Sequence, residues 1–306
     1  FCAFTLIIIF AGVQNGIERV SKIMMPILIV LSVIIAVYSV TRPGALAGVK
    51  YFLVPNVKNF SWMTVVSAMG QMFYSLSIAM GILITFGSYM KKDTAIEDST
   101  RNVEVFDTGI AIMAGLMIIP AVFAFSGGDP NTLQAGPSLM FITIPKVFQN
   151  MGFGTVIGIV FFLLVLFAAV TSSIALTESA VSTFEDELGW GRKKATVLVG
   201  VIMLALGSLS SLGYGPLAGI KIIGMQFLDL FDFLTNSVMM PIAALLTSLL
   251  VSRVVGIDKI EDEIIHGESA FRRKKVFVVM IKYLCPVFAI IILLSSVANA
   301  LGWIKM

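Results

Sequence analysis

Long apolar runs separated by short polar stretches make up most of the 306-residue sequence. A helix needs about 20 apolar residues to cross the hydrocarbon core of a bilayer, and several runs reach that length. A transmembrane β-barrel would show short segments of alternating polarity instead. The pattern predicts an all-α integral membrane protein with about eight transmembrane segments, near 1–13, 17–40, 62–89, 99–126, 155–186, 193–212, 226–252 and 275–302.

The connection between the fourth and fifth segments, 127–154, is rich in Gly and Pro but still apolar. Backbone of this kind is tolerated at a membrane where it folds back onto protein, so we expect a re-entrant hairpin. Lys and Arg gather in alternate loops, for example at 192–194 and 272–275. Since basic loops are typically cytoplasmic, we expect 127–154 on the extracellular side.

Composition supports the membrane interpretation and excludes several other classes. Hydrophobic residues make up 58% of the chain and charged residues 13%, with a mean hydropathy of +0.98, beyond the range of soluble domains. The net charge of +3 is small and its basic residues flank membrane segments, so nucleic acid is not an expected partner. The single histidine, His266, lies in a polar loop, so no Ser–His dyad can form in the membrane, and the sequence contains no HExxH zinc motif. An enzyme is therefore not expected. Because the sequence starts at Phe1 inside an apolar run, we expect an N-terminally truncated fragment.

The segment 62–89 contains many residues that weaken a helix. Gly70, Gly81 and Gly87 fall within it, although an interior Gly costs nearly 1 kcal/mol relative to Ala. Polar residues are interspersed among them. A helix broken near 77–81 explains this composition, because unwound backbone that lines a cavity can bind ions and polar substrate groups.

Three other polar sites, one single residue and two pairs, each have two possible interpretations. Asp107 is either an acid in the first turns of a helix, favoured by the helix dipole, or a cation ligand facing the bundle interior. Thr171 and Ser172 either bond to the carbonyl one turn back or hold a hard cation such as sodium. Asp229 and Asp232, one turn apart, are either solvated acids or part of an ion-paired gate.

Six motifs together resemble the sodium-coupled neurotransmitter and amino-acid symporter family, in its bacterial branch, which shares the leucine-transporter fold. These motifs are GIERVSKIMMP at 16–26, GQMFYSLSIAMGILITFGSYM at 70–90, DTGIAIMAGLMIIPAVFAF at 107–125, AGPSLMFITIPKVF at 135–148, AAVTSSIALTESAVSTFEDEL at 168–188 and LDLFDFLTN at 228–236. The resemblance implies an inverted-repeat bundle in which this chain corresponds to helices four to eleven. Residues 1–306 then form one transporter domain, with 1–40 as the remainder of the first repeat, 62–252 as the second repeat and 275–302 as an additional helix.

The resemblance also implies roles for individual residues. One sodium ion would be bound by the Ser75 hydroxyl and Asp107, and a second by the Ala168 carbonyl with the Thr171 and Ser172 hydroxyls. The residues implied to contact substrate are Tyr74, Ser75, Ser77, Met80, Ser172 and Leu176. Those implied to gate the site are Gln71 and Asp232 outside and Ser88, Tyr89 and Asp186 inside, with Gly16 and Pro26 flanking a stretch where a helix can unwind.

The function implied is sodium-coupled symport of amino acids by alternating access, with no organic cofactor and Na⁺ as the coupling ion. Apolar residues at Met80, Leu176 and Ile78 favour hydrophobic or aromatic substrates. Chloride-dependent members place Asn and Ser where this chain has Asp107 and Ala111, so transport is expected to be chloride-independent. A proton-coupled carrier and a non-transporting sensor stay open as alternatives, as does a homodimer. The expected location is the bacterial cytoplasmic membrane, with the lipid bilayer as surroundings.

Overall fold

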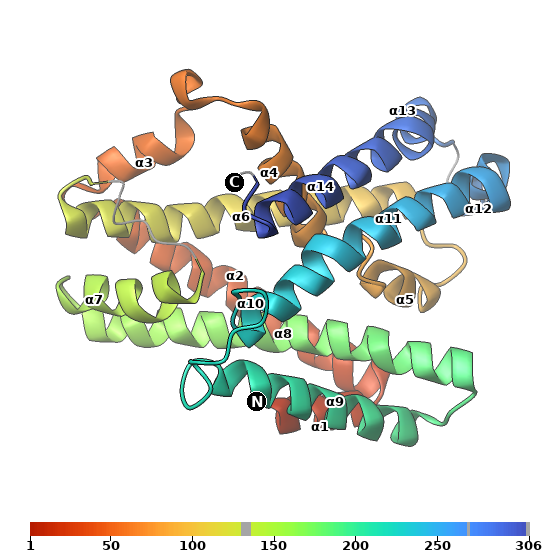
Figure 1. The fold of residues 1–306 in the computed structure, drawn as a ribbon, viewed down its shortest axis with the longest axis horizontal. Coiled ribbons are helices and arrows are strands. Elements are labelled where there is room, and N and C mark those ends of the chain that lie inside the picture. The colour runs from red at the N-terminus through yellow and green to blue at the C-terminus, as the bar shows by residue number, and fades with distance from the viewer. Residues whose placement is uncertain (130–135, 268–269, 304–306) are drawn as a thin grey trace. The chain divides into compact units, whose positions relative to one another are not determined.

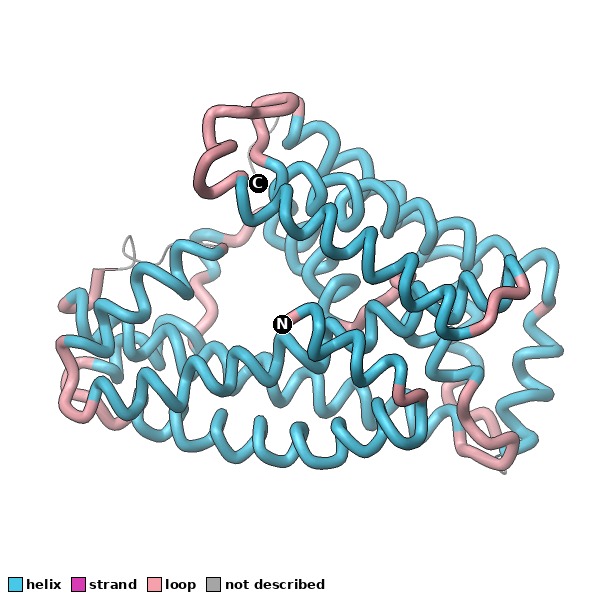
Figure 2. Tube along the Cα trace, turned by 90° about the horizontal axis from the view of Figure 1, so that it is seen from below, coloured by secondary structure: helices cyan, strands magenta, loops and turns pink. Residues whose placement is uncertain are grey.

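The computed structural model describes residues 1–129, 136–267 and 270–303, and these are almost entirely helical, with no strand among them (Figure 2). Within the described residues, six helical runs are long and apolar enough to cross a membrane. These runs are Val13–Val40, Ile96–Ser126, Gly154–Leu188, Arg192–Leu212, Phe227–Val255 and Lys274–Ala300. The multi-pass helical class predicted from hydropathy is confirmed.

Several of these runs change from α to π geometry along their length, and Figure 1 labels the α-helical parts. In chain order the elements are α1 (Cys2–Phe10), η1 (Val13–Glu18), α2 (Arg19–Val40), α3 (Ala45–Leu53), η2 (Val57–Asn59), α4 (Trp62–Ser75), α5 (Ile82–Ser88), α6 (Ile96–Ser126), η4 (Leu139–Thr143), α7 (Ile144–Gln149), α8 (Gly154–Leu188), α9 (Arg192–Leu212), α10 (Phe227–Asp232), η5 (Phe233–Met239), α11 (Met240–Leu249), η6 (Leu250–Val255), α12 (Ile257–Gly267), α13 (Lys274–Val279), η7 (Met280–Leu284) and α14 (Cys285–Ala300).

All eight predicted segments contain helix. The first is short, at nine residues, and the third is interrupted. Hydropathy missed α3 and α12, because both are too short to span a membrane, at 9 and 11 residues, and α12 is also strongly polar. The expected hairpin at 127–154 contains η4 and α7, which form one apolar helix, while 130–135 lie outside the described residues.

The chain forms two compact units, which cross the boundaries of the expected repeats. Unit 1 comprises Phe1, Ile7–Phe60 and Val105–Ile174, and unit 2 comprises Cys2–Leu6, Ser61–Glu104 and Ala175–Met306. Long helices such as α6 and α8 contribute to both units. The repeat boundaries drawn from the sequence stay a prediction.

Unit 1 is built around an apolar core supplied by α2, α6, α7 and α8. Phe148 of α7 and Phe161 of α8 meet edge to face with ring centroids 5.4 Å apart, and both are buried. A polar contact adds to this core, since the Ser39 hydroxyl of α2 donates to the Met117 carbonyl of α6 at 2.7 Å. The fold-back of α7 is therefore fixed by buried aromatic packing.

Unit 2 has a second core, formed where α4, α11 and α14 meet. Phe73, Met240 and Ile292 are buried there. Helices α11 and α14 lie side by side (Figure 1) and pack against each other, and α4 packs on α14. A capping box starts α4, because Ser61 and Thr64 each accept a hydrogen bond from the other's backbone N–H at 3.3 Å. This core holds the half-helix that carries Gln71, Tyr74 and Ser75 of the candidate site.

Candidate functional site

The third apolar segment is interrupted where the sequence predicts it. Helix α4 ends at Ser75 and α5 begins at Ile82. Between them Ser77 and Ala79 have φ of 54° and 62°, and Gly81 has φ of 80°. The Ile78 N–H reaches the Phe73 carbonyl at 3.0 Å and so closes the end of α4. Left-handed backbone at two non-glycine residues costs energy and is typical of functional sites.

Packing on both sides stabilises this break. Ile78, Ala79 and Met80 pack against the unit 2 core around Phe73 and Met240. At Gly81, an added Cβ would lie 2.7 Å from the Ser179 Oγ atom, so only glycine suits both the positive φ and the close approach to α8. The break is thus a defined conformation of packed residues.

Of the residues predicted to contact substrate, five belong to unit 2: Tyr74, Ser75, Ser77, Met80 and Leu176. Tyr74 and Ser75 are on the last turn of α4, and Ser77 and Met80 are in the break. Tyr74 is 51% and Leu176 is 49% exposed, so both keep free surface for a ligand. Ser172 lies in unit 1, and a shared substrate site stays a prediction.

The predicted second sodium site lies on one stretch of α8 in unit 1. Thr171 Oγ1 donates to the Ala168 carbonyl at 3.0 Å and to the Phe167 carbonyl at 3.1 Å. This hydrogen bond to the preceding turn is the first of the two interpretations of Thr171 drawn from the sequence. It also brings two of the three predicted oxygen ligands together, and Ser172, the third, is exposed on the same helix. Clustered neutral oxygens suit a hard cation.

Asp107 does not lie in the first turns of its helix, so that reading is wrong. Helix α6 begins at Ile96, which places Asp107 three turns in, beyond the range of the dipole effect. Its side chain is partly buried. The second reading, a cation ligand, therefore stays as a prediction; Asp107 lies in unit 1 and its predicted partner Ser75 in unit 2.

A cavity of about 370 Å³ in unit 2 brings together the two predicted outer gate residues, and we call it the Asp232 cavity. Asp232 and Gln71 line it with Tyr74 of the predicted substrate site. Asp232 is exposed, and its Oδ1 atom accepts a hydrogen bond of 2.6 Å from Asn236. The remaining lining residues come from α4, η5, α11 and α14: Gly70, Phe73, Asn236, Ser237, Met240, Pro241, Ile292 and Ser296.

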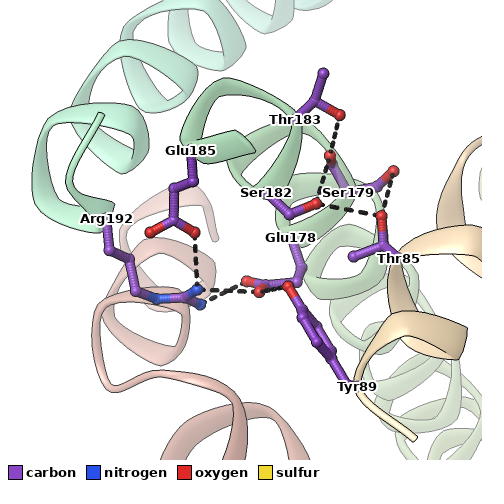
Figure 3. Close-up of polar contacts among 8 residues, drawn as sticks. All are labelled: Thr85, Tyr89, Glu178, Ser179, Ser182, Thr183, Glu185 and Arg192. Carbon is purple, nitrogen blue, oxygen red and sulfur yellow. Dashed lines mark hydrogen bonds and ion pairs between the residues drawn. The ribbon is translucent and has the colours of Figure 1, made fainter. Parts of the chain in front are cut away.

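A second polar group, which we call the Glu178 network, joins Tyr89 to α8 and α9 (Figure 3). Glu178 is 0% exposed and receives the Tyr89 hydroxyl at 2.8 Å. The Arg192 guanidinium contacts both Glu178 oxygens, at 3.0 and 2.5 Å, and reaches Glu185 at 3.4 Å. The bidentate geometry and the tyrosine together satisfy a carboxylate that would otherwise be costly to bury.

Buried hydroxyls continue the contact between α5 and α8 (Figure 3). Thr85 Oγ1 lies 3.2 Å from Ser182 Oγ and 3.4 Å from Ser179 Oγ. Ser182 and Thr183 also donate to the Ser179 carbonyl, at 3.1 and 2.8 Å. The half-helix after the break is therefore held to α8 at its middle, through Thr85, and just beyond its end, through Tyr89.

Two of the three predicted inner gate residues are not part of this network. The Ser88 hydroxyl donates to the Thr85 carbonyl of its own helix at 2.7 Å, and Asp186 is exposed. Sequence reasoning missed Glu178 and Arg192. A charged residue inside the apolar run that contains Thr171 and Ser172 was the available signal for Glu178, because such a residue needs a partner.

The region around Gly16 and Pro26 is helical throughout. Val13–Glu18 has π geometry, and α2 continues through Pro26. A Cβ on Gly16 would lie 2.2 Å from the Ile8 carbonyl oxygen, so a side chain there would clash with the end of α1. Unwinding between Gly16 and Pro26 stays a prediction.

Known proteins resemble this chain over nearly its whole length. It is 34% identical over 298 residues to the uncharacterised sodium-dependent transporter YhdH of Bacillus subtilis, covering 97% of this chain and 65% of YhdH. An uncharacterised sodium-dependent transporter of Haemophilus influenzae is 31% identical over 298 residues, covering 97% of this chain and 64% of the relative. The chain therefore spans about 65% of the length of these curated relatives.

A solved structure has the same fold. The crystal structure of MhsT in complex with L-phenylalanine superposes with a TM-score of 0.83 at 34% identity, covering 97% of this chain and 66% of MhsT. The fold class, a leucine-transporter-type bundle, is confirmed by this match.

A multi-pass helical bundle with a broken helix lined by polar groups defines the class of secondary transporters. The family model described as Sodium:neurotransmitter symporter family matches residues 1–303, and the chain belongs to that family.

Proposed function

We propose that this protein moves amino acids across the membrane by sodium-coupled symport with alternating access. The observation that carries the proposal is the packed helix break at 76–81 in a member of a sodium symporter family. Unwound backbone and half-helix ends offer dipoles to a polar substrate at the membrane interior, where water cannot. The bacterial cytoplasmic membrane is the proposed location.

The proposed substrates are amino acids with hydrophobic or aromatic side chains. Met80 and Ile78 lie at the break, and Leu176 offers an exposed apolar side chain on α8. Methionine adapts its shape to different partners, so Met80 suits a pocket that accepts more than one side chain. The related protein MhsT was crystallised with L-phenylalanine, an amino acid of this class.

Sodium is proposed as the driving ion and enters as a co-substrate. Ala168 and Thr171 already place a carbonyl and a hydroxyl oxygen 3.0 Å apart, and Ser172 adds a second hydroxyl. To bind Na⁺, the Thr171 hydroxyl would turn a lone pair of its oxygen toward the ion while it donates its hydrogen bond to the Phe167 carbonyl. A proton needs no such group of neutral oxygens, which favours sodium over proton coupling.

The test is uptake of labelled amino acids by the full-length protein in proteoliposomes. A sodium gradient should drive accumulation of phenylalanine or leucine, and an equal potassium gradient should not. Accumulation driven by a pH gradient without sodium would favour a proton-coupled carrier. Saturable binding with no accumulation would favour a sensor, and either result would overturn the proposal.

Thr171→Ala should raise the sodium concentration for half-maximal uptake about tenfold, because a hydrogen-bonding or coordinating contact to a charged group contributes roughly 1.5–3 kcal/mol. Thr183→Ala is the matched control, since Thr183 makes the same back-bond on α8, to Ser179 at 2.8 Å, but is no proposed ligand. An equal shift in both variants would indicate a helix effect and contradict the sodium site.

Chloride should have no effect on uptake. Asp107 already supplies the negative charge that a bound anion would provide, and Ala111 lacks a hydroxyl to hold one. Replacing chloride with gluconate in the proteoliposome assay measures this directly. Loss of uptake in gluconate would refute the proposed role of Asp107.

A further inference from the structure

A groove of about 560 Å³ runs along the exposed side of α11 and η6 in unit 2. Its walls are apolar and its lining contains one charged residue, Arg253. Leu246, Leu250 and Val254 are between 50% and 73% exposed, as expected for side chains that face lipid. The full lining is Leu246, Thr247, Leu249, Leu250, Arg253 and Val254.

A second cation lies on the helical segment that packs against the end of this groove. Arg253 belongs to η6 and Lys282 to η7, and these two π-helical segments contact each other. Both side chains are exposed. Among the described residues, neither takes part in an ion pair.

Basic residues nearby behave differently. Arg273 pairs with Glu104 at 2.9 Å and with Glu97 at 3.9 Å, and Lys274 pairs with Glu261 of α12. The pKa of Arg273 is raised, chiefly by its hydrogen bond to Glu104. Carboxylates are thus available in this region, and α12 packs on η6, yet Arg253 and Lys282 lack one among the residues that the structure describes.

The position of Lys282 calls for an anion. It lies eight residues inside the span Lys274–Ala300, about 12 Å along a helix from its start. A charged ammonium inside the hydrocarbon is costly, and a long side chain lowers that cost by reaching toward the headgroups. A lipid phosphate that meets the extended side chain would balance the charge.

We propose that Arg253 and Lys282, together with the groove, bind an anionic phospholipid in the leaflet next to the 272–275 loop. The Arg253 guanidinium donates two hydrogen bonds to the phosphate oxygens, and Lys282 adds a third donor. An acyl chain lies along Leu246, Leu249 and Leu250. Two cations on one phosphate region select an anionic lipid over a zwitterionic one.

Native mass spectrometry of the full-length protein, released from nanodiscs of equal phosphatidylglycerol and phosphatidylcholine, tests the site. The parent should retain phosphatidylglycerol preferentially. Arg253→Gln and Lys282→Gln should each reduce that preference about fivefold, since a basic residue near an anionic surface contributes about 1 kcal/mol. The charge-conserving variants Arg253→Lys and Lys282→Arg should keep more of the preference than the glutamine variants do, because the positive charge remains.

Lys259→Gln is the control, because Lys259 is an exposed base on α12 outside the groove. The proposal is overturned if this control lowers the preference equally, or if the two glutamine variants match the parent. It is also overturned if inorganic phosphate displaces the bound species, or if the variants change the oligomeric state without changing the lipid bound. None of these measurements uses transport, so they are independent of the proposed function.

Discussion

The Glu178 network and the Asp232 cavity are two acidic centres of unit 2 in opposite states. Glu178 is fully buried and its two oxygens are occupied by Arg192 and Tyr89. Asp232 is exposed beside a cavity, and its carboxylate accepts a hydrogen bond from a neutral amide, Asn236. The carboxylate that is paired with a cation is buried. The carboxylate that is hydrogen-bonded to a neutral amide remains in contact with solvent.

The difference suggests what each centre is suited for. Removing one partner of the Glu178 network leaves a charge buried away from water, which is costly, so the intact ion pair stabilises the packing around it. Asp232 can gain or lose a partner at little cost because it is already in solvent. The Glu178 carboxylate therefore depends on its partners, and the Asp232 carboxylate does not.

The largest effect is expected from removing the cation of the Glu178 network. Arg192→Gln leaves the Glu178 carboxylate buried without a charge partner, a change that costs about 3–5 kcal/mol in comparable buried pairs. The unfolding temperature of the purified protein in detergent should fall on the order of 10 °C.

The double variant Glu178→Gln with Arg192→Gln should recover much of that loss, since two neutral amides replace the pair. Equal unfolding temperatures for the single and double variants would show that the buried charge is not the cause. Burial of the Glu178 charge would then not explain why its partners are needed.

A smaller effect is expected from the hydroxyl cluster beside the network. Thr85→Val removes the hydroxyl that contacts Ser179 and Ser182 while keeping the volume of the side chain. A buried hydrogen bond contributes about 1 kcal/mol, so the unfolding temperature should fall by a few degrees. Ser210→Ala, which removes an exposed back-bond to the Leu206 carbonyl, is the control and should change it less.

The smallest effect on stability is expected at Asp232. Asp232→Asn keeps the shape of an exposed side chain, so the unfolding temperature should match that of the parent. Ligand dissociation measured on the full-length protein should change several-fold, because the charge on the cavity wall is lost. Asp229→Asn, one turn away and outside the cavity lining, should leave dissociation unchanged. A large drop in the unfolding temperature with Asp232→Asn would show that Asp232, like Glu178, is needed for stability.

Much of the fold could be predicted from local patterns. Hydropathy predicted the membrane class and the approximate spans, because the thickness of the bilayer fixes how many consecutive apolar residues a spanning helix needs. Clustered glycines and polar residues at 70–89 predicted the helix break, because backbone conformation is a local property. The short helices α3 and α12 were missed, since both are too short for a spanning pattern and α12 is also polar.

The site was predictable in part. Gln71, Tyr74 and Asp232 were selected from motifs and share one cavity, and Tyr89 was selected and bonds to Glu178. Ser88 and Asp186 were also selected, but the Ser88 hydroxyl donates to the Thr85 carbonyl of its own helix and Asp186 is exposed. These residues are close in sequence to members of the network, but the direction in which each side chain leaves its helix decides which residues make contact.

The sequence by itself determined a membrane-spanning helical protein, the position of its broken helix and a set of polar positions inside apolar segments. Tertiary structure alone decided which of these polar groups pair. Tyr89 lies 89 residues from Glu178 along the chain and Arg192 lies 14 residues from it, on the next helix. Packing of α5 and the start of α9 against α8 brings the phenol and the guanidinium to one buried carboxylate. The cost of burying that charge is local, but the groups that offset it come from elsewhere in the chain.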